Sequence, residues 1–130
     1  MLCALLSNFG QTFFIALYNE AIRTDFDLSF AELGSLYAGA TLLSAVVYFF
    51  VGKFIDEWPL ARFTLFVFSG LVIGCVLLGL TSNIYLFFVG LYLVRQFGQG
   101  LASHTGTTAI ARAYEKNRGT AVAIGQLGFP

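Results

Sequence analysis

The sequence predicts an all-α fold, a polytopic bundle of transmembrane helices. Hydrophobic residues make up 58% of the 130 positions and charged residues only 11%, and the mean hydropathy is +0.80. Soluble domains contain about 25% charged residues, so this composition indicates a membrane protein. The apolar residues also gather in long runs, and a spanning helix needs about 20 such residues.

Four of the runs are long enough to cross a bilayer, and each is predicted to form one helix. They cover residues about 2–22, 33–51, 63–81 and 84–111, and a fifth run begins near residue 119. A cleavable signal peptide would carry a basic region ahead of the first run, but residues 1–9 are uncharged. The fifth run reaches Pro130 after about a dozen residues, too few to span. We therefore expect a fragment of four and a half helices whose polypeptide continues past Pro130.

The charged residues lie almost entirely between these runs, and only Glu20 and Arg95 fall inside them. Basic residues in short connections favour the cytoplasmic side. The second and fourth connections contain five of them, Lys53, Arg62, Arg112, Lys116 and Arg118, whereas the first contains Arg23 alone. We therefore expect an integral protein of the plasma (inner) membrane with a cytoplasmic N-terminus. The formal net charge is zero, and no basic patch is wide enough to bind a nucleic acid.

Arg95 is the charged residue whose position most needs explaining. It lies twelve residues after Asn83, so at 1.5 Å per residue it is roughly 18 Å into a hydrocarbon core about 30 Å thick. Exposing an arginine to lipid at this depth costs at least about 2.5–3.5 kcal/mol, and such residues usually face a partner or an aqueous cavity. Two interpretations stay open. Arg95 fixes helix packing through carbonyl or carboxylate groups, or it belongs to a substrate or coupling pathway.

Other polar residues accompany Arg95. Residues three and four apart share a helix face, which groups Tyr92, Arg95, Gln96, Gln99 and Ser103. The first run contains a similar group, Asn8, Gln11 and Thr12. Two such helices either line one aqueous cavity or hydrogen-bond to each other inside the bundle. A histidine side chain can accept and release protons in the physiological pH range, so His104 either relays a proton or hydrogen-bonds to a neighbouring helix.

Several classes of function are excluded by missing residues. His104 is the only histidine, and Cys3 and Cys75 lie in separate apolar runs, so we expect no metal site and no cofactor. No nucleophile with a paired base and no nucleotide-binding motif occurs, so we do not expect an enzyme. Gly70 and Gly74 have the Gly-x-x-x-Gly spacing that permits close helix contact, although chance explains it equally well in a glycine-rich apolar sequence.

The connection after the second run, Gly-Lys-Phe-Ile-Asp-Glu-Trp-Pro-Leu-Ala-Arg, resembles the signature between helices two and three of the major facilitator superfamily. Gly52, Asp56 and Arg62 match it. Three positions depart from it, with Glu57 and Ala61 in place of basic residues and Pro59 in place of a glycine. Physically, Gly52 permits a tight exit from its helix, Asp56 can cap a neighbouring helix N-terminus, and Arg62 supplies a counter-charge. The three form a candidate conformational gate.

Three further stretches resemble the same family. Arg95 to Gly100 is similar to its fourth-helix motif, with one residue of extra spacing. Arg112 to Gly119 is similar to the basic loop before helix five, and Gly125 to Pro130 is similar to the start of helix five. The resemblance implies the beginning of one six-helix half of a twelve-helix secondary transporter. Such transporters expose a central site alternately to each side of the membrane, and the missing C-terminal half of the same polypeptide would complete it.

The resemblance implies that helices one and four line the cavity. It also implies three partners, which are the lipid bilayer, a small solute and a coupling proton. The candidate substrate or coupling residues are Arg95, Gln96, Gln99, Gln11, Asn8 and His104. A guanidinium pairs with a carboxylate through two parallel hydrogen bonds, which favours small organic anions as substrates. The same arginine could instead serve proton coupling. A polytopic scaffold or receptor subunit, with its polar residues used in packing, is the alternative to a transporter.

Overall fold

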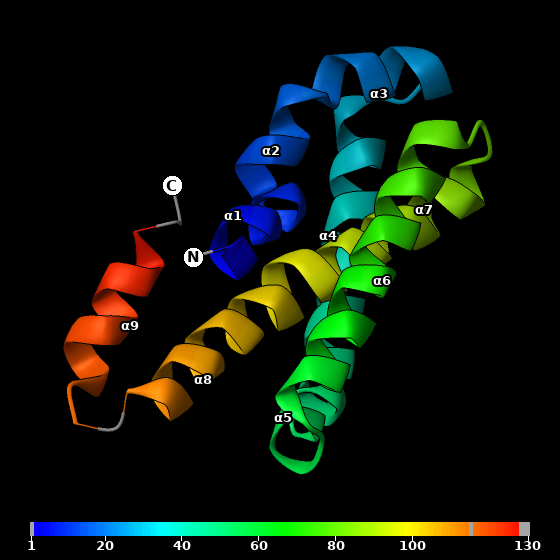
Figure 1. Ribbon diagram of the computed structural model, residues 1–130. Helices are drawn as coiled ribbons and strands as arrows, with labels where there is room; N and C mark the ends of the chain where they lie inside the picture. Colours follow the sequence, from blue (N-terminus) through cyan, green and yellow to red (C-terminus); the bar gives the residue numbers. More distant parts are fainter. Residues whose placement is uncertain (1, 115, 128–130) are drawn as a thin grey trace.

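The computed structural model describes residues 2–114 and 116–127, and every regular element in this part of the chain is a helix (Figure 1). Two helical stretches, Phe30–Glu57 and Leu60–Leu80, are long and apolar enough to cross a membrane. The first contains α4 (Phe30–Val51) and the short α5 (Phe54–Glu57), and the second is α6 (Leu60–Leu80). The prediction of an all-α membrane fold is confirmed.

The fourth predicted segment is helical over its whole length but changes its winding. It consists of α7 (Ile84–Leu93), a π-helix η2 (Val94–Ala102) and α8 (Ser103–Ala113). The helix α9 (Arg118–Gln126) follows, beginning close to residue 119. The residues 128–130 of the predicted fifth helix lie outside the described residues.

The first segment is interrupted twice, and the prediction of one continuous helix over residues 2–22 is wrong. Its parts are α1 (Leu2–Ser7), the 3-10 turn η1 (Asn8–Gly10), α2 (Thr12–Leu17) and α3 (Asn19–Phe26). Gln11 has extended backbone angles, φ −78° and ψ 149°, which end the helical hydrogen bonding. The carbonyl of Gly10 instead accepts a hydrogen bond from the side chain of Arg95 at 3.0 Å. A long-range polar contact therefore replaces part of the local helix.

The helix α4 begins three residues earlier than expected because its N-terminus is capped. The Oγ of Ser29 accepts from the backbone N–H of Glu32 at 3.2 Å, and Glu32 Oε2 accepts from the backbone N–H of Ser29 at 2.9 Å. This reciprocal capping box satisfies two helix-end donors that would otherwise be unpaired. The helix α6 likewise starts directly after Pro59, at Leu60. A proline has no N–H to leave unsatisfied there.

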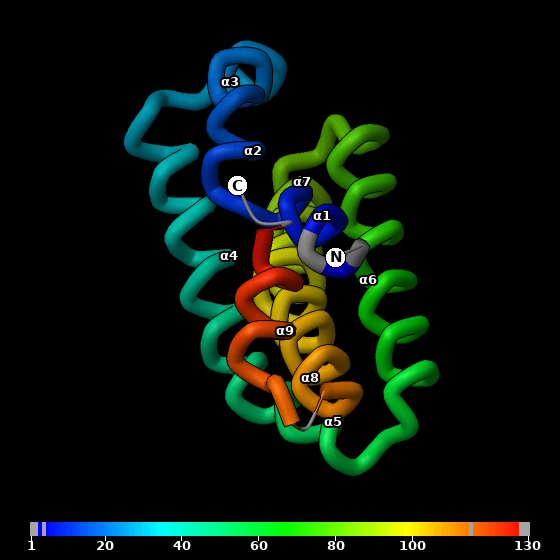
Figure 2. The backbone as a smooth tube through the Cα atoms, turned by 60° about the vertical axis from the view of Figure 1, so that its left-hand side comes forward, coloured from blue at the N-terminus to red at the C-terminus, as the bar shows by residue number. Residues whose placement is uncertain are grey.

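The elements have two distinguishable ends in Figures 1 and 2. At one end lie α3 and the turn between α6 and α7, and we call it the α3 end. At the other lie α5 and the connection between α8 and α9, and we call it the α5 end. Each end has its own buried apolar cluster. The cluster at the α5 end contains Ile55, Phe63, Val67, Leu101 and Ala102, and that at the α3 end contains Leu33, Ala40, Phe87 and Leu91.

The helix α6 packs closely on the fourth segment through its glycines. Gly70 and Gly74 are both buried. A Cβ placed on Gly70 would lie 2.6 Å from the ring of Phe97, and one on Gly74 would lie 2.9 Å from Val94 Cγ2. The Gly-x-x-x-Gly spacing thus marks a real helix contact. Large apolar side chains such as Phe49 and Leu80, 80% and 82% exposed, point away from the bundle, as lipid-facing residues do.

Candidate functional site

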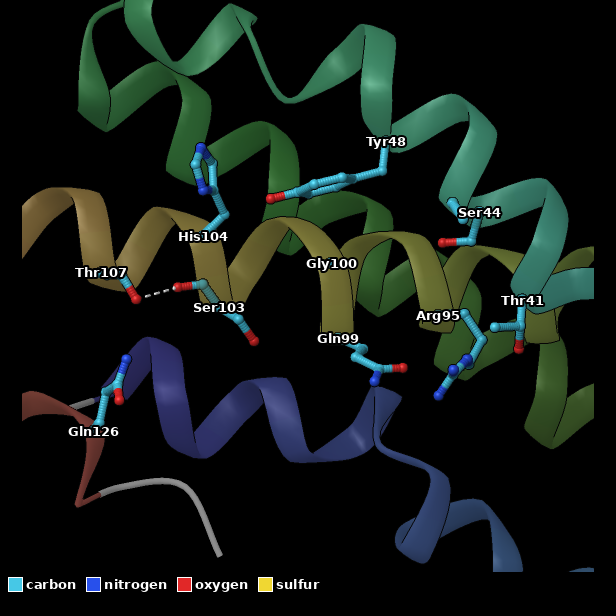
Figure 3. Close-up of a pocket in the computed structure, with 11 residues that line it drawn as sticks. Thr41, Ser44, Tyr48, Arg95, Gln99, Gly100, Ser103, His104, Thr107 and Gln126 are labelled. Carbon is cyan, nitrogen blue, oxygen red and sulfur yellow. Dashed lines mark hydrogen bonds between the residues drawn. The ribbon is translucent and has the colours of Figure 1, made fainter.

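A cavity of about 480 Å³ lies between α4 and the second half of the fourth segment, with α9 at its edge (Figure 3). It is lined by Thr41, Ser44, Ala45, Tyr48, Arg95, Gln99, Gly100, Ser103, His104, Thr107 and Gln126. Seven of these eleven residues carry a hydroxyl or an amide group. Among the described lining residues, Arg95 is the only lysine or arginine and there is no carboxylate. The cavity therefore favours an anionic or neutral polar ligand over a cationic one.

Arg95 is only 6% exposed, and part of its guanidinium is already engaged. Nη1 donates to the backbone oxygen of Gly10 at 3.0 Å and to Thr12 Oγ1 at 3.3 Å. The guanidinium carbon also lies 4.8 Å from the ring centroid of Tyr37, a cation–π distance. Nε is buried without a partner among the described residues, and Nη2 forms no hydrogen bond with any of them. Arg95 therefore binds the first segment and still has an unused pair of donors.

Thr12, Tyr37 and Arg95 form one connected group, which we call the Arg95 layer. The hydroxyl of Tyr37 donates to Thr12 Oγ1 at 2.7 Å, and the same oxygen accepts from Arg95. A second pocket, of about 190 Å³, lies towards the α3 end and is lined by Thr12 and Tyr37 together with residues of α2, α3, α4 and α7. Arg95 lines the large cavity and the other two members line the small pocket. The layer therefore lies between the two spaces.

A close backbone crossing holds Arg95 against the first segment. Gly10 and Gly98 are both buried. A Cβ on Gly98 would lie 2.9 Å from both Cα and N of Gly10, and a Cβ on Gly10 would lie 2.5 Å from the carbonyl oxygen of Val94. Only glycine permits an approach this close on both sides. The crossing brings the carbonyl of Gly10 within reach of the arginine.

The structure brings together some of the predicted site residues. Arg95, Gln99 and His104 line the cavity, and the His104 ring meets that of Tyr48 edge-on at 5.9 Å (Figure 3). Gln96 does not belong to the described lining. It is 2% exposed, and neither atom of its amide has a hydrogen-bond partner among the described residues.

The two predicted residues of the first segment also lie elsewhere. Neither Asn8 nor Gln11 is in the described lining of the cavity. The Oδ1 of Asn8 is buried with no partner in the described part of the chain. In a continuous helix, Asn8, Gln11 and Thr12 would share one face. The break at Gln11 removes this shared face. Their role in a substrate site thus stays a prediction.

The second apolar run contains hydroxyl groups that also face the cavity. Thr41, Ser44 and Tyr48 of α4 all line the cavity. Their spacing of three and four residues places them on one helix face. This face was detectable as a hydroxyl stripe within an otherwise apolar helix. In the described lining, α4 and not the expected first segment forms the wall opposite the fourth segment.

The candidate gate at the α5 end uses a different arginine from the one expected. Arg112 Nη2 donates to Asp56 Oδ1 and to the backbone oxygen of Ile55, both at 3.0 Å. Arg62 is exposed and makes no ion pair with a described residue. Asp56 therefore pairs with a side chain instead of capping a helix. Gly52 has ordinary helical angles, φ −57° and ψ −32°, so the expected tight exit does not use its conformational freedom.

Comparison with known proteins identifies the family. The family model described as Major Facilitator Superfamily matches residues 1–130, the whole of the sequence. Searches of curated proteins and of solved structures give no match. The family is one of membrane transporters and not of enzymes. With its helical bundle and its apolar spans, the chain belongs to the major facilitator superfamily.

Proposed function

We propose that this chain forms part of a secondary active transporter that moves small organic anions by alternating access, with Arg95 as the anion-binding residue. The observation that carries the proposal is a buried arginine that lines a cavity whose described lining contains no carboxylate. Its Nε has no hydrogen-bond partner among the described residues. An uncompensated charge at this depth is costly, so a ligand that neutralises it would bind favourably.

The geometry of the guanidinium favours a carboxylate in particular. Nε and Nη2 lie on one side of the group and point in parallel, and these are the donors without a described partner. A carboxylate accepts two parallel hydrogen bonds from such a pair. Lysine offers a single point charge instead and cannot reproduce this arrangement.

Neighbouring polar groups would recognise the rest of the substrate. Gln99 presents an amide to the cavity, and the Oγ of Ser103 is buried without a partner among the described residues. His104 lines the same cavity, and we propose that its imidazole carries a proton that moves with the anion. A substrate with hydroxyl or carbonyl groups beside its carboxylate would match these contacts.

For its place in the membrane, we propose the cytoplasmic side for the α5 end and for the N-terminus. Lys53, Arg62, Arg112, Lys116 and Arg118 all belong to connections or helix ends on that side, as the positive-inside tendency requires. Further helices of the same polypeptide, the C-terminal half implied by the family, would cover the open side of the cavity.

The competing function is a membrane scaffold or receptor subunit in which Arg95 only ties helices together. Its hydrogen bond to the carbonyl of Gly10 favours this alternative. Substituting Arg95 separates the two roles. In proteoliposomes supplied with small carboxylates, Arg95→Lys should lower uptake at least tenfold because one bidentate contact is lost, and Arg95→Leu should abolish uptake.

Thermal unfolding of the same purified variants completes the test. A scaffold role predicts that Arg95→Leu lowers the unfolding temperature while any protein still folded keeps its uptake. Arg23 offers a matched control, since its Nε donates to the Leu28 backbone oxygen at 3.2 Å and its guanidinium stacks on Phe30 at 3.4 Å, outside the cavity. Arg23→Lys should leave uptake unchanged. Normal uptake by Arg95→Leu would exclude the proposed role.

A further inference from the structure

We propose that Thr41 determines specificity by accepting a hydrogen bond from a hydroxyl group next to the substrate carboxylate, so that the preferred ligands are 2-hydroxy acids. The inference deepens the proposed function and rests on it, because it places that carboxylate on Arg95. Thr41 belongs to α4, the wall of the cavity opposite the fourth segment that carries Arg95.

The hydroxyl proton of Thr41 is already used inside its own helix. Thr41 Oγ1 donates to the backbone oxygen of Tyr37, one turn earlier in α4, at 2.8 Å. A hydroxyl group has one proton to donate and two lone pairs that accept. No described residue donates a hydrogen bond to Thr41 Oγ1. What Thr41 offers to a ligand is therefore an acceptor.

This acceptor lies at the end of the cavity where Arg95 is. The guanidinium carbon of Arg95 is 4.8 Å from the ring centroid of Tyr37, and Thr41 follows Tyr37 by about one helical turn. Thr41 and Arg95 both line the cavity, and Figure 3 shows them at one end of it and Thr107 at the other. A carboxylate held by Arg95 would therefore have the substituents of its neighbouring carbon, C2, close to Thr41.

An acceptor at this place distinguishes between the groups that C2 can carry. A hydroxyl group donates to Thr41 Oγ1. A keto oxygen only accepts, so it would meet the Thr41 lone pairs with no proton between the two oxygens, and an unsubstituted acid would form no hydrogen bond there. An ammonium group would bring a charge that no carboxylate of the described lining neutralises. The arrangement therefore favours 2-hydroxy acids over 2-oxo, 2-amino and unsubstituted acids.

Binding of four small acids that differ only at C2 tests the inference. They are racemic lactate, pyruvate, racemic alanine and propionate. The complete protein, purified in detergent, is titrated with each acid, and the dissociation constant follows from the rise in unfolding temperature, since a ligand stabilises the folded state that it binds. We expect lactate to bind about fivefold more tightly than propionate, which corresponds to the ~1 kcal/mol of one net hydrogen bond. Pyruvate and alanine should bind no more tightly than propionate.

Substitution of Thr41 assigns this preference to its hydroxyl group. Thr41→Val removes the hydroxyl and nearly keeps the volume, so lactate and propionate should bind with equal affinity. Thr41→Ser keeps a hydroxyl and should keep the preference. The unfolding temperature without ligand shows whether each variant is folded.

Thr107→Val is the matched control for position. Thr107 Oγ1 also donates to a carbonyl one turn earlier, that of Ser103 at 3.0 Å, and Thr107 lines the same cavity. It lies at the end away from Arg95 (Figure 3). The ratio of the lactate and propionate affinities should therefore be the same in Thr107→Val as in the wild type.

The outcomes separate this inference from the proposed function. Equal binding of lactate and propionate by the wild type, equal binding of lactate and pyruvate, or a preference that survives in Thr41→Val would each overturn the role of Thr41, even if uptake of carboxylates depends on Arg95. A preference for lactate that Thr41→Val removes, in a protein that takes up no carboxylate, would support the role of Thr41 and refute the proposed transport. No stabilisation by any of the four acids would refute both.

Discussion

Replacing Gly10 with alanine should force apart the two backbones that cross at the centre of the bundle. The added Cβ would lie 2.5 Å from the carbonyl oxygen of Val94 and 2.9 Å from Gly98 Cα, whereas ordinary contact begins at 3.4 Å. The obstructing atoms are main-chain atoms, so no side-chain rotation can relieve the overlap. The backbone N of Gln99 lies closer still, so one backbone must move by at least about 0.9 Å, the difference between 3.4 and 2.5 Å.

The expected loss of stability is about 2–3 kcal/mol, in the upper part of the range for overpacked cores. The movement would also lengthen the hydrogen bond from Arg95 to the Gly10 carbonyl, so uptake should fall together with stability. Thermal unfolding of the purified protein in detergent, followed by circular dichroism, measures the first effect.

Gly34→Ala is the control for this experiment. A Cβ at Gly34 meets nothing within 4 Å, and alanine is a better helix former than glycine by up to about 1 kcal/mol. This variant should therefore be at least as stable as the wild type. If Gly10→Ala unfolds at the same temperature as Gly34→Ala, the crossing is looser than described, and the account of how Arg95 is held fails.

Two further predictions concern the α5 end. Asp56→Arg and Arg112→Asp should each reduce uptake. Each should change the free energy of unfolding by no more than about 1 kcal/mol, because the ion pair is largely exposed. The double variant, in which the two charges are exchanged, should recover part of the uptake. No recovery in the double variant would argue that the two side chains act separately. Cysteines at Lys53 and Lys116 should react with impermeant reagents from the cytoplasmic side alone, and reaction of either from outside would reverse the proposed orientation.

The helical segments and their connections could be predicted from the sequence, because the length of an apolar run and the positions of charged residues can be read directly from it. The run that became α6 had to be a helix, since lipid offers its backbone no other partners. Arg95 was noticeable in the sequence because a charged side chain within an apolar run is costly to expose to lipid. The Gly70 and Gly74 spacing permitted a close helix contact but fitted chance equally well, and the structure shows that the contact is formed.

What sequence could not predict were contacts between distant residues. The partner of Arg95 is a backbone carbonyl 85 positions away, at Gly10, and backbone groups are the same at every position of a sequence. The break at Gln11 adjoins that contact, and no proline or turn motif in the sequence marks it. Asp56 and Arg112 are 56 residues apart, and a nearer arginine, Arg62, seemed the natural counter-charge.

The π-helical winding of η2 decides whether His104 reaches the cavity at all. His104 follows Arg95 by nine positions, and an α-helix turns by about 100° per residue. Nine residues would then give two full turns and half a turn more, which would put the two side chains on opposite sides. Both line the same cavity because η2 closes its hydrogen bonds five residues apart and so holds more residues in each turn. A return of η2 to α-helical winding would leave Arg95 in place and rotate the imidazole out of the cavity.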